Sequence, residues 1–157
     1  MQSSLSDLLS IDHILIGLDA IDAQDAIRQL ASALMKTGHV GAEFAEDVWQ
    51  REQTFPTGLP TQPLPVAIPH ADATHVNRSA VCVGTLNSEV KFAQMGTDGS
   101  TKLVTRLIFL LAIKEQEKQV QMIQQLMTLL QTPSLLEGLA GVETPSEALA
   151  LITTAVD

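Results

Sequence analysis

The chain has 157 residues, 45% of them hydrophobic and 17% charged, which is enough apolar material for one folded domain and excludes a chain that is disordered throughout. Nine basic residues stand against eighteen acidic ones, and the net charge of −9 disfavours nucleic acids and anionic membranes as partners, because like charges repel. With one Trp and no Tyr, the chain is also poorly suited to stacking nucleic-acid bases.

No membrane-directing segment is expected. Residues 1–18 have no basic start, and Asp7 and Asp12 break their apolar runs, so they do not form a signal peptide. The longest apolar run, residues 107–113, is far too short to span a bilayer. Cys82 is the single cysteine and is expected to be a small buried hydrophobe without a disulfide partner. We therefore expect a soluble, cytoplasmic protein.

The first third of the chain predicts a short strand and two helices. Residues 14–16 are a brief apolar run typical of a strand. Asp22 is a good helix N-cap, apolar residues then recur at helical spacing over 26–35, and Gly38 ends the pattern. Residues 43–53 carry a second helical pattern that stops before a proline.

The middle of the chain predicts strands. Residues 66–68 are extended by the prolines that bracket them, and residues 80–86 form another apolar run. Residues 89–92 are a shorter candidate that leads into a glycine-containing turn. The run at 103–113 is the strongest strand, and its continuous apolar character indicates burial on both faces.

The last third predicts helices over residues 117–131, 134–139 and 145–155. The inward face of the first of these is expected to consist of Val120, Ile123, Leu126, Met127 and Leu130. Strands and helices alternate, so the expected class is α/β, with helices flanking a mixed sheet. The chain contains no linker, and we expect one domain over residues 1–157, structured from about 5 to 155.

A proline-rich stretch, residues 51–75, separates the early helices from the strands. Residues 57–65 are predicted to be a loop. Within the stretch, Pro69 stiffens the chain next to His70, which is expected to be fixed in direction yet exposed. A neutral imidazole can act as a nucleophile, whereas the alternative is a structural histidine beside a turn proline.

Other chemistry near this histidine is less well supported. Arg51 could bind phosphoryl oxygens with its guanidinium group, or it could simply interact with the end of its own helix. His70, Asp72 and His75 are spaced H-x-D-x-x-x-H, which leaves a metal-dependent hydrolase as an alternative, although a fourth ligand is not evident. The sequence has no phosphate-binding glycine loop and no G-x-S-x-G or H-E-x-x-H motif, and we expect neither a cofactor nor a metal.

The residues REQTFPTG, starting at Arg51, together with VAIPH, ending at His70, resemble the IIA proteins of the bacterial phosphoenolpyruvate-dependent sugar phosphotransferase system. The branch is the fructose–mannitol type (EIIA type 2), and the stretch is most similar to galactitol-specific IIA components. The resemblance extends from the first helix to the last and implies a mixed sheet flanked by helices.

That resemblance implies a phosphoryl carrier. His70 would accept phosphate on Nε2 from the phosphocarrier protein HPr and pass it to a cysteine of a IIB component, which serves a membrane IIC component. Arg51 would stabilise the phosphoryl charge, and Asp72 and His75 would take no part. The transported sugar, galactitol or another, cannot be read from the chain.

Many members of the family have a second active-site histidine at the position of Gln119. Galactitol-type proteins resemble this chain in having a glutamine there. Phe55, Leu59 and Leu64 are candidates for an apolar rim that docks partners, and a monomer is sufficient for the role. The alternative within the family is a regulatory protein that binds partners according to its phosphorylation state.

Overall fold

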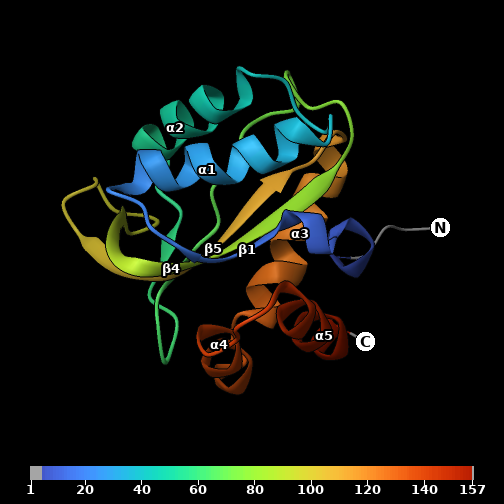
Figure 1. The fold of residues 1–157 in the computed structure, drawn as a ribbon. Helices are drawn as coiled ribbons and strands as arrows, with labels where there is room; N and C mark the ends of the chain where they lie inside the picture. The colour runs from blue at the N-terminus through green and yellow to red at the C-terminus, as the bar shows by residue number, and fades with distance from the viewer. Residues whose placement is uncertain (1–4, 157) are drawn as a thin grey trace.

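The computed structural model describes residues 5–156, which form one mixed sheet with helices on both faces (Figure 1). The strands are β1 (Ile14–Leu18), β2 (Gly58–Leu59), β3 (Val66–Ala67), β4 (Ala80–Ala93) and β5 (Lys102–Ala112). The helices are α1 (Ala23–Lys36), α2 (Phe44–Thr54), α3 (Gln116–Leu129), α4 (Pro133–Ala140) and α5 (Pro145–Val156), preceded by the 3-10 turns η1 (Leu5–Leu8) and η2 (Ile11–His13). The predicted α/β class is confirmed.

The sheet has the strand order β1-β4-β5-β3-β2, so its two longest strands lie near the centre. β4 and β5 pair antiparallel, with Cys82 opposite Leu110. β1 runs parallel to β4 and β3 parallel to β5, whereas β2 is antiparallel to β3. Parallel neighbours require long connections, and α1 and α2 lie in the connection between β1 and β4.

Helices cover the sheet on two sides: α1 and α2 on one face, and α3, α4 and α5 on the other (Figure 1). The central strand β5 serves both cores, because successive side chains point to opposite faces. Ile108 and Leu110 pack with α1 and α2, whereas Phe109 and Leu111 pack with the other three helices. This confirms the prediction that β5 is buried on both faces.

The close packing of α1 on β4 depends on Gly84. A Cβ atom at this position would lie 2.8 Å from Leu30 Cδ2, which is closer than carbon atoms can approach without a shift. The absent side chain therefore lets the helix lie directly against the centre of the sheet.

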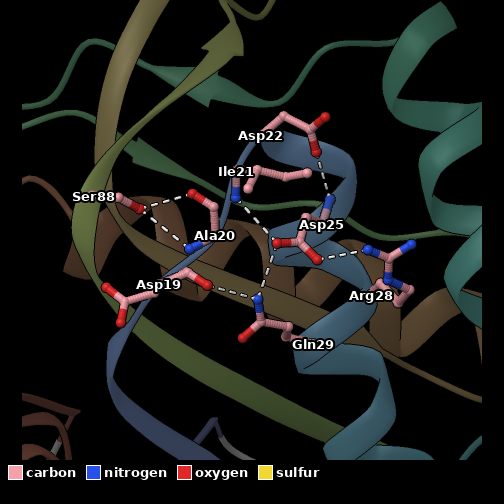
Figure 2. A network of polar contacts seen from close by, with 8 residues as sticks. All are labelled: Asp19, Ala20, Ile21, Asp22, Asp25, Arg28, Gln29 and Ser88. Carbon is pink, nitrogen blue, oxygen red and sulfur yellow. Dashed lines mark hydrogen bonds and ion pairs between the residues drawn. The ribbon is translucent and has the colours of Figure 1, made fainter.

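The start of α1 is fixed by the predicted cap and by a contact with β4 (Figure 2). The Asp22 carboxylate accepts a hydrogen bond from Asp25 N–H at 2.8 Å, and Asp25 in turn accepts one from the backbone N–H of Ile21 at 3.1 Å. Ser88 Oγ donates to the carbonyl of Ala20 at 2.8 Å. The first bond pairs an N–H group that a helix start leaves without an intrahelical partner, the second joins the first turn to the residue before the cap, and the third ties this segment to β4.

Two of the predicted strand assignments were wrong in detail. The segments 80–86 and 89–92 are one strand, β4, which continues through a shift in register between Thr85 and Val90. The predicted loop at 57–65 contains the short strand β2. Local sequence could show neither, because pairing with β5 and β3 supplies the hydrogen bonds that make these residues extended.

The predicted inward face of α3 was wrong at one position. Val120 is 55% exposed, and the buried side chains are Met122, Leu126 and Leu129. Val120 lies two residues before Met122, and two residues correspond to a turn of about 200° around a helix, so both cannot face the sheet. Within residues 5–156, no helix is long and apolar enough to cross a bilayer.

Candidate functional site

The chain reaches His70 by continuing along β5 beyond the end of β3. Val66 lies opposite Leu107 in a parallel pairing, and three residues after β3 His70 forms a bridge with Leu111. Leu111 N–H donates to the Pro69 carbonyl at 3.0 Å. Pro69 has a fixed φ and no N–H to pair, so the backbone that carries His70 is held rigidly against the end of a central strand.

His70 is only 8% exposed, so the expectation of an exposed histidine was wrong. The bridge to Leu111 draws it into the sheet, where its neighbours Ile68 and Ala71 are also buried. Its Nδ1 lies 2.8 Å from the carbonyl oxygen of Ile68. A carbonyl oxygen can only accept, so Nδ1 carries the proton, and in the neutral ring the lone pair is on Nε2.

The surroundings of His70 favour its neutral form. Burial lowers the pKa of His70 below its ordinary value, and the positive charge of Arg51 lowers it further, whereas the hydrogen bond to Ile68 opposes these effects. Because the net direction is downward from 6.5, the imidazole is largely neutral at pH 7. The ring is thus a nucleophile with one available nitrogen.

Arg51 lies in the last turn of α2 with its side chain exposed. Its guanidinium carbon is 5.1 Å from the centre of the Phe55 ring, a cation–π contact. The arginine borders a hollow of about 350 Å³ between α2 and the segment that follows His70, lined by Asp47, Gln50, Arg51, Thr54, Phe55, Ala71, Asp72 and Thr74. Ala71, the neighbour of His70, lines this hollow, and the charge of Arg51 acts on His70, so the fold brings Arg51 and His70 to one region although they are 19 positions apart in the chain.

The end of α2 is fixed by a buried carboxylate that the sequence analysis did not single out. Glu52 is 5% exposed and accepts two hydrogen bonds from Thr57, one from N–H and one from Oγ, each 2.8 Å long. Burial raises the pKa of Glu52, and the two bonds partly offset that effect. The pair holds the turn after the helix and with it the C-terminal end of α2, which carries Arg51.

The remaining polar residues of the stretch do not form a metal site. His75 Nδ1 bonds to the carboxylate of Asp47, and Asp72 Oδ1 accepts bonds from Thr74 N–H at 3.0 Å and Thr74 Oγ at 2.6 Å. Within residues 5–156, no group of three His, Cys, Asp or Glu side chains is placed to hold a metal ion. The H-x-D-x-x-x-H spacing therefore does not assemble as the hydrolase alternative would require.

Gln119 lies near the start of α3, after the end of β5. Its Oε1 is buried and has no hydrogen-bond partner among the described residues, and no bond joins Gln119 to His70 or Arg51 there. Of the three rim candidates, Phe55 is 59% exposed and Leu64 is half-buried. Leu59 is only 8% exposed and packs in the core, which argues against contact with a partner.

The structure thus brings into one region the two residues on which the resemblance rests, a stiff, neutral histidine at the end of a central strand and an arginine whose charge acts on it. A family model described as "Phosphoenolpyruvate-dependent sugar phosphotransferase system, EIIA 2" matches residues 7–155. The chain belongs to this family, and the resemblance inferred from the sequence is confirmed.

Among curated proteins, the galactitol-specific EIIA component of the phosphotransferase system of Escherichia coli is 25% identical over 123 residues, which cover 78% of this chain and 81% of that protein. The transcriptional regulator ManR of Bacillus subtilis is 30% identical over 115 residues, 72% of this chain but 16% of the regulator.

Among solved structures, the crystal structure of IIA mannitol from Escherichia coli is 27% identical with a TM-score of 0.76 and covers 92% of this chain and 98% of its own. The solved complex of enzyme IIAMTL with phosphorylated enzyme IIBMTL from the same organism has a TM-score of 0.76 at 26% identity, covering 93% of this chain and 97% of its own.

Proposed function

We propose that the chain carries a phosphoryl group on Nε2 of His70, taking it from the phosphohistidine of HPr and giving it to the cysteine of a IIB component. The observation that carries the proposal is the 2.8 Å contact between His70 Nδ1 and the Ile68 carbonyl. It assigns the proton to Nδ1 and leaves Nε2 as the nucleophile.

The Nε2 lone pair attacks phosphorus in line, the new N–P bond forms, and the N–P bond of the donor breaks. The His70 ring then bears a positive charge shared between its nitrogens, and its Nδ1–H keeps donating to Ile68. A hydrogen bond from a charged donor is stronger than one from a neutral donor, so the carbonyl stabilises the phosphorylated ring. In the second step the IIB cysteine thiolate attacks phosphorus and the electron pair of the N–P bond returns to Nε2.

Arg51 supplies positive charge next to the transferring group. It already acts electrostatically on the His70 ring, and no ion pair occupies it within residues 5–156. Phosphoryl transfer is catalysed mainly by positioning and by stabilising charge on the oxygens, for which a planar guanidinium is well suited. Gln119 contributes at most a hydrogen bond, because an amide carries no charge.

The proposal is tested by incubating the protein with phosphoenolpyruvate, enzyme I and HPr and measuring acid-labile phosphate. We expect about one phosphate per chain, none in His70→Gln, and normal labelling in His39→Gln, a control histidine in a different part of the fold. Labelling of His70→Gln at the wild-type level would refute the assignment.

The proposed physiological role is uptake and phosphorylation of a hexitol or related sugar through IIB and membrane IIC components. The galactitol-specific relative supports this role. The match to a transcriptional regulator supports the alternative, a regulatory protein whose contacts depend on phosphorylation of His70. IIB and IIC genes next to this gene would favour transport, and transfer of phosphate to the encoded IIB would establish it.

A further inference from the structure

Arg51 has an acidic residue in the position where a helical ion pair is expected, yet it does not form that pair. Asp47 precedes Arg51 by four residues on α2, and an acidic residue four positions before a basic one is a favourable arrangement for a salt bridge. Among residues 5–156, Arg51 forms no ion pair, and the ion pair of Asp47 is with His75. The guanidinium group makes a cation–π contact with the Phe55 ring.

The Asp47 carboxylate is instead bonded to His75. His75 Nδ1 contacts Asp47 Oδ2, and His75 Nε2 lies 3.9 Å from the carboxylate of Glu43. The bond to Asp47, followed by the negative charges of Asp47, Glu43 and Asp72, raises the pKa of His75. The imidazole therefore lies between the carboxylates of Glu43 and Asp47, and it binds Asp47, which is one helical turn before Arg51.

The backbone of His75 is fixed independently of this contact. Its carbonyl accepts a hydrogen bond from Gly41 N–H at 2.9 Å, and the adjacent Val76 bridges Val40. The imidazole is thus presented to α2 by a segment that does not need Asp47 to stay in place. The contact therefore fixes the position of the Asp47 carboxylate and is not needed to hold the backbone at His75.

The second acid near Arg51 is also engaged elsewhere. Asp72 lines the same hollow, but its Oδ1 binds Thr74 within its own loop. Arg51 lowers the pKa of Asp72 only as a minor contribution after the Thr74 bonds. The two acids that line the hollow with Arg51, Asp47 and Asp72, are thus each bonded to another residue.

We propose that His75 is a positioning residue for phosphoryl transfer: by binding Asp47 it prevents the Asp47–Arg51 salt bridge and keeps the Arg51 guanidinium available to the phosphoryl group. The inference rests on the proposed function of His70 and Arg51, and it gives a role to a residue that the sequence analysis expected to take no part. Without His75, the freed Asp47 would pair with Arg51, and each transfer would first have to break that pair.

The kinetic test measures the rate of phosphoryl uptake from phosphorylated HPr. An exposed helical pair is weak, so His75→Ala is expected to slow uptake by about two- to fivefold. Removing the competing carboxylate as well, in Asp47→Asn/His75→Ala, is expected to restore the wild-type rate. Glu46→Gln is the matched control, because it removes a neighbouring carboxylate on α2 that bonds Gln50 and not His75.

A purely structural role for His75 would leave the double variant as slow as His75→Ala, and that result, or a His75→Ala rate equal to the wild type, would overturn the inference. Circular dichroism and thermal melting check that each variant is folded.

A second measurement does not depend on transfer. In the His75→Ala background, Asp47→Asn is expected to shift the NMR signals of the Arg51 guanidinium, because an ion pair is lost, whereas in the wild-type background it leaves them nearly unchanged. Equal shifts in both backgrounds would overturn the inference. If the wild type accepts no phosphate, the proposed function fails, and the NMR comparison still decides whether His75 controls the Asp47–Arg51 pair.

Discussion

Thr57→Val tests how strongly the buried pair of Glu52 and Thr57 fixes the end of α2. The substitution keeps the volume and the β-branch but removes the hydroxyl that donates to Glu52 at 2.8 Å. Both residues are at least 95% buried, with exposed fractions of 3% and 5%, so water does not readily replace the lost donor. A hydrogen bond to a charged group contributes about 1.5–3 kcal/mol, which is the expected loss in the free energy of unfolding.

The assay is urea or thermal unfolding followed by circular dichroism. For a domain of this size, each kcal/mol shifts Tm by about 2–4 °C, so Thr57→Val is expected to lower Tm by about 3–12 °C. Glu52→Gln is expected to cost less than about 1 kcal/mol, because the amide oxygen can accept from Thr57 N–H while its nitrogen donates to Thr57 Oγ.

Thr54→Val is the matched control on the same helix. Thr54 is exposed, and its hydroxyl reaches only the Gln50 carbonyl at 3.4 Å, so a change within about 0.5 kcal/mol is expected. The reasoning is refuted if Thr57→Val is as stable as the wild type, or if Glu52→Gln is as damaging as Glu52→Ala.

Three further predictions concern the rest of the fold. Burial lowers the pKa of His13 and His39 below 6.5, so their contribution to stability is complete above pH 6.5 and is lost as the pH falls through their folded pKa values. In His39→Asn the free energy of unfolding should therefore depend less on pH over this window, and an unchanged pH dependence would contradict this. Gly84→Ala places a methyl group 2.8 Å from Leu30 Cδ2 and should lower the free energy of unfolding in urea by about 1–3 kcal/mol. In the Leu30→Ala background, where the clashing side chain is absent, the same substitution should cost much less. Equal losses in both backgrounds would show that the close approach is not the cause. Burial raises the pKa of Cys82 to about 12, so iodoacetamide at pH 8 should label the thiol in urea but not in the folded protein, and rapid labelling without urea would show that it is accessible.

The elements that sequence predicted well are those with local signals. Asp22 caps α1 as expected, since an acceptor side chain before an amphipathic run needs no distant partner to act. The helix predicted over residues 134–139 is α4, in which Pro133 supplies the fixed φ of the first turn and Gly141 follows the end, so its bounds also come from local backbone preferences. The continuous apolar run that became β5 is long enough to be recognised before its neighbours are known.

Features that depend on distant pairing were missed or misplaced. β2 has two residues and exists because Gly58 and Leu59 pair with β3. His70 is buried because it bridges Leu111, which a reading of residues 66–70 alone could not reveal. Val120 was assigned to the core because several apolar positions in α3 suit more than one face, and packing on the sheet selects between them.

The candidate site shows the same division. The identities of His70 and Arg51 came from a motif, whereas the proton on Nδ1 follows from the hydrogen bond to the Ile68 carbonyl. Every residue has a backbone carbonyl, so the sequence gives no sign of which one His70 binds. The Asp47–His75 contact joins residues 28 positions apart, and the carboxylate of Glu43 lies near the other ring nitrogen of His75. No spacing rule connects a helix to a loop across that distance.

In the proposed function, His70 accepts phosphate on Nε2, the ring nitrogen that the Ile68 hydrogen bond leaves unprotonated. The most direct test is NMR of the histidine ring nitrogens after phosphorylation by enzyme I and HPr. A single phosphohistidine at His70 with phosphorus bonded to Nε2, and Nδ1–H still hydrogen-bonded, is the predicted result. Phosphate on Nδ1 of His70, or on any other histidine, would contradict it.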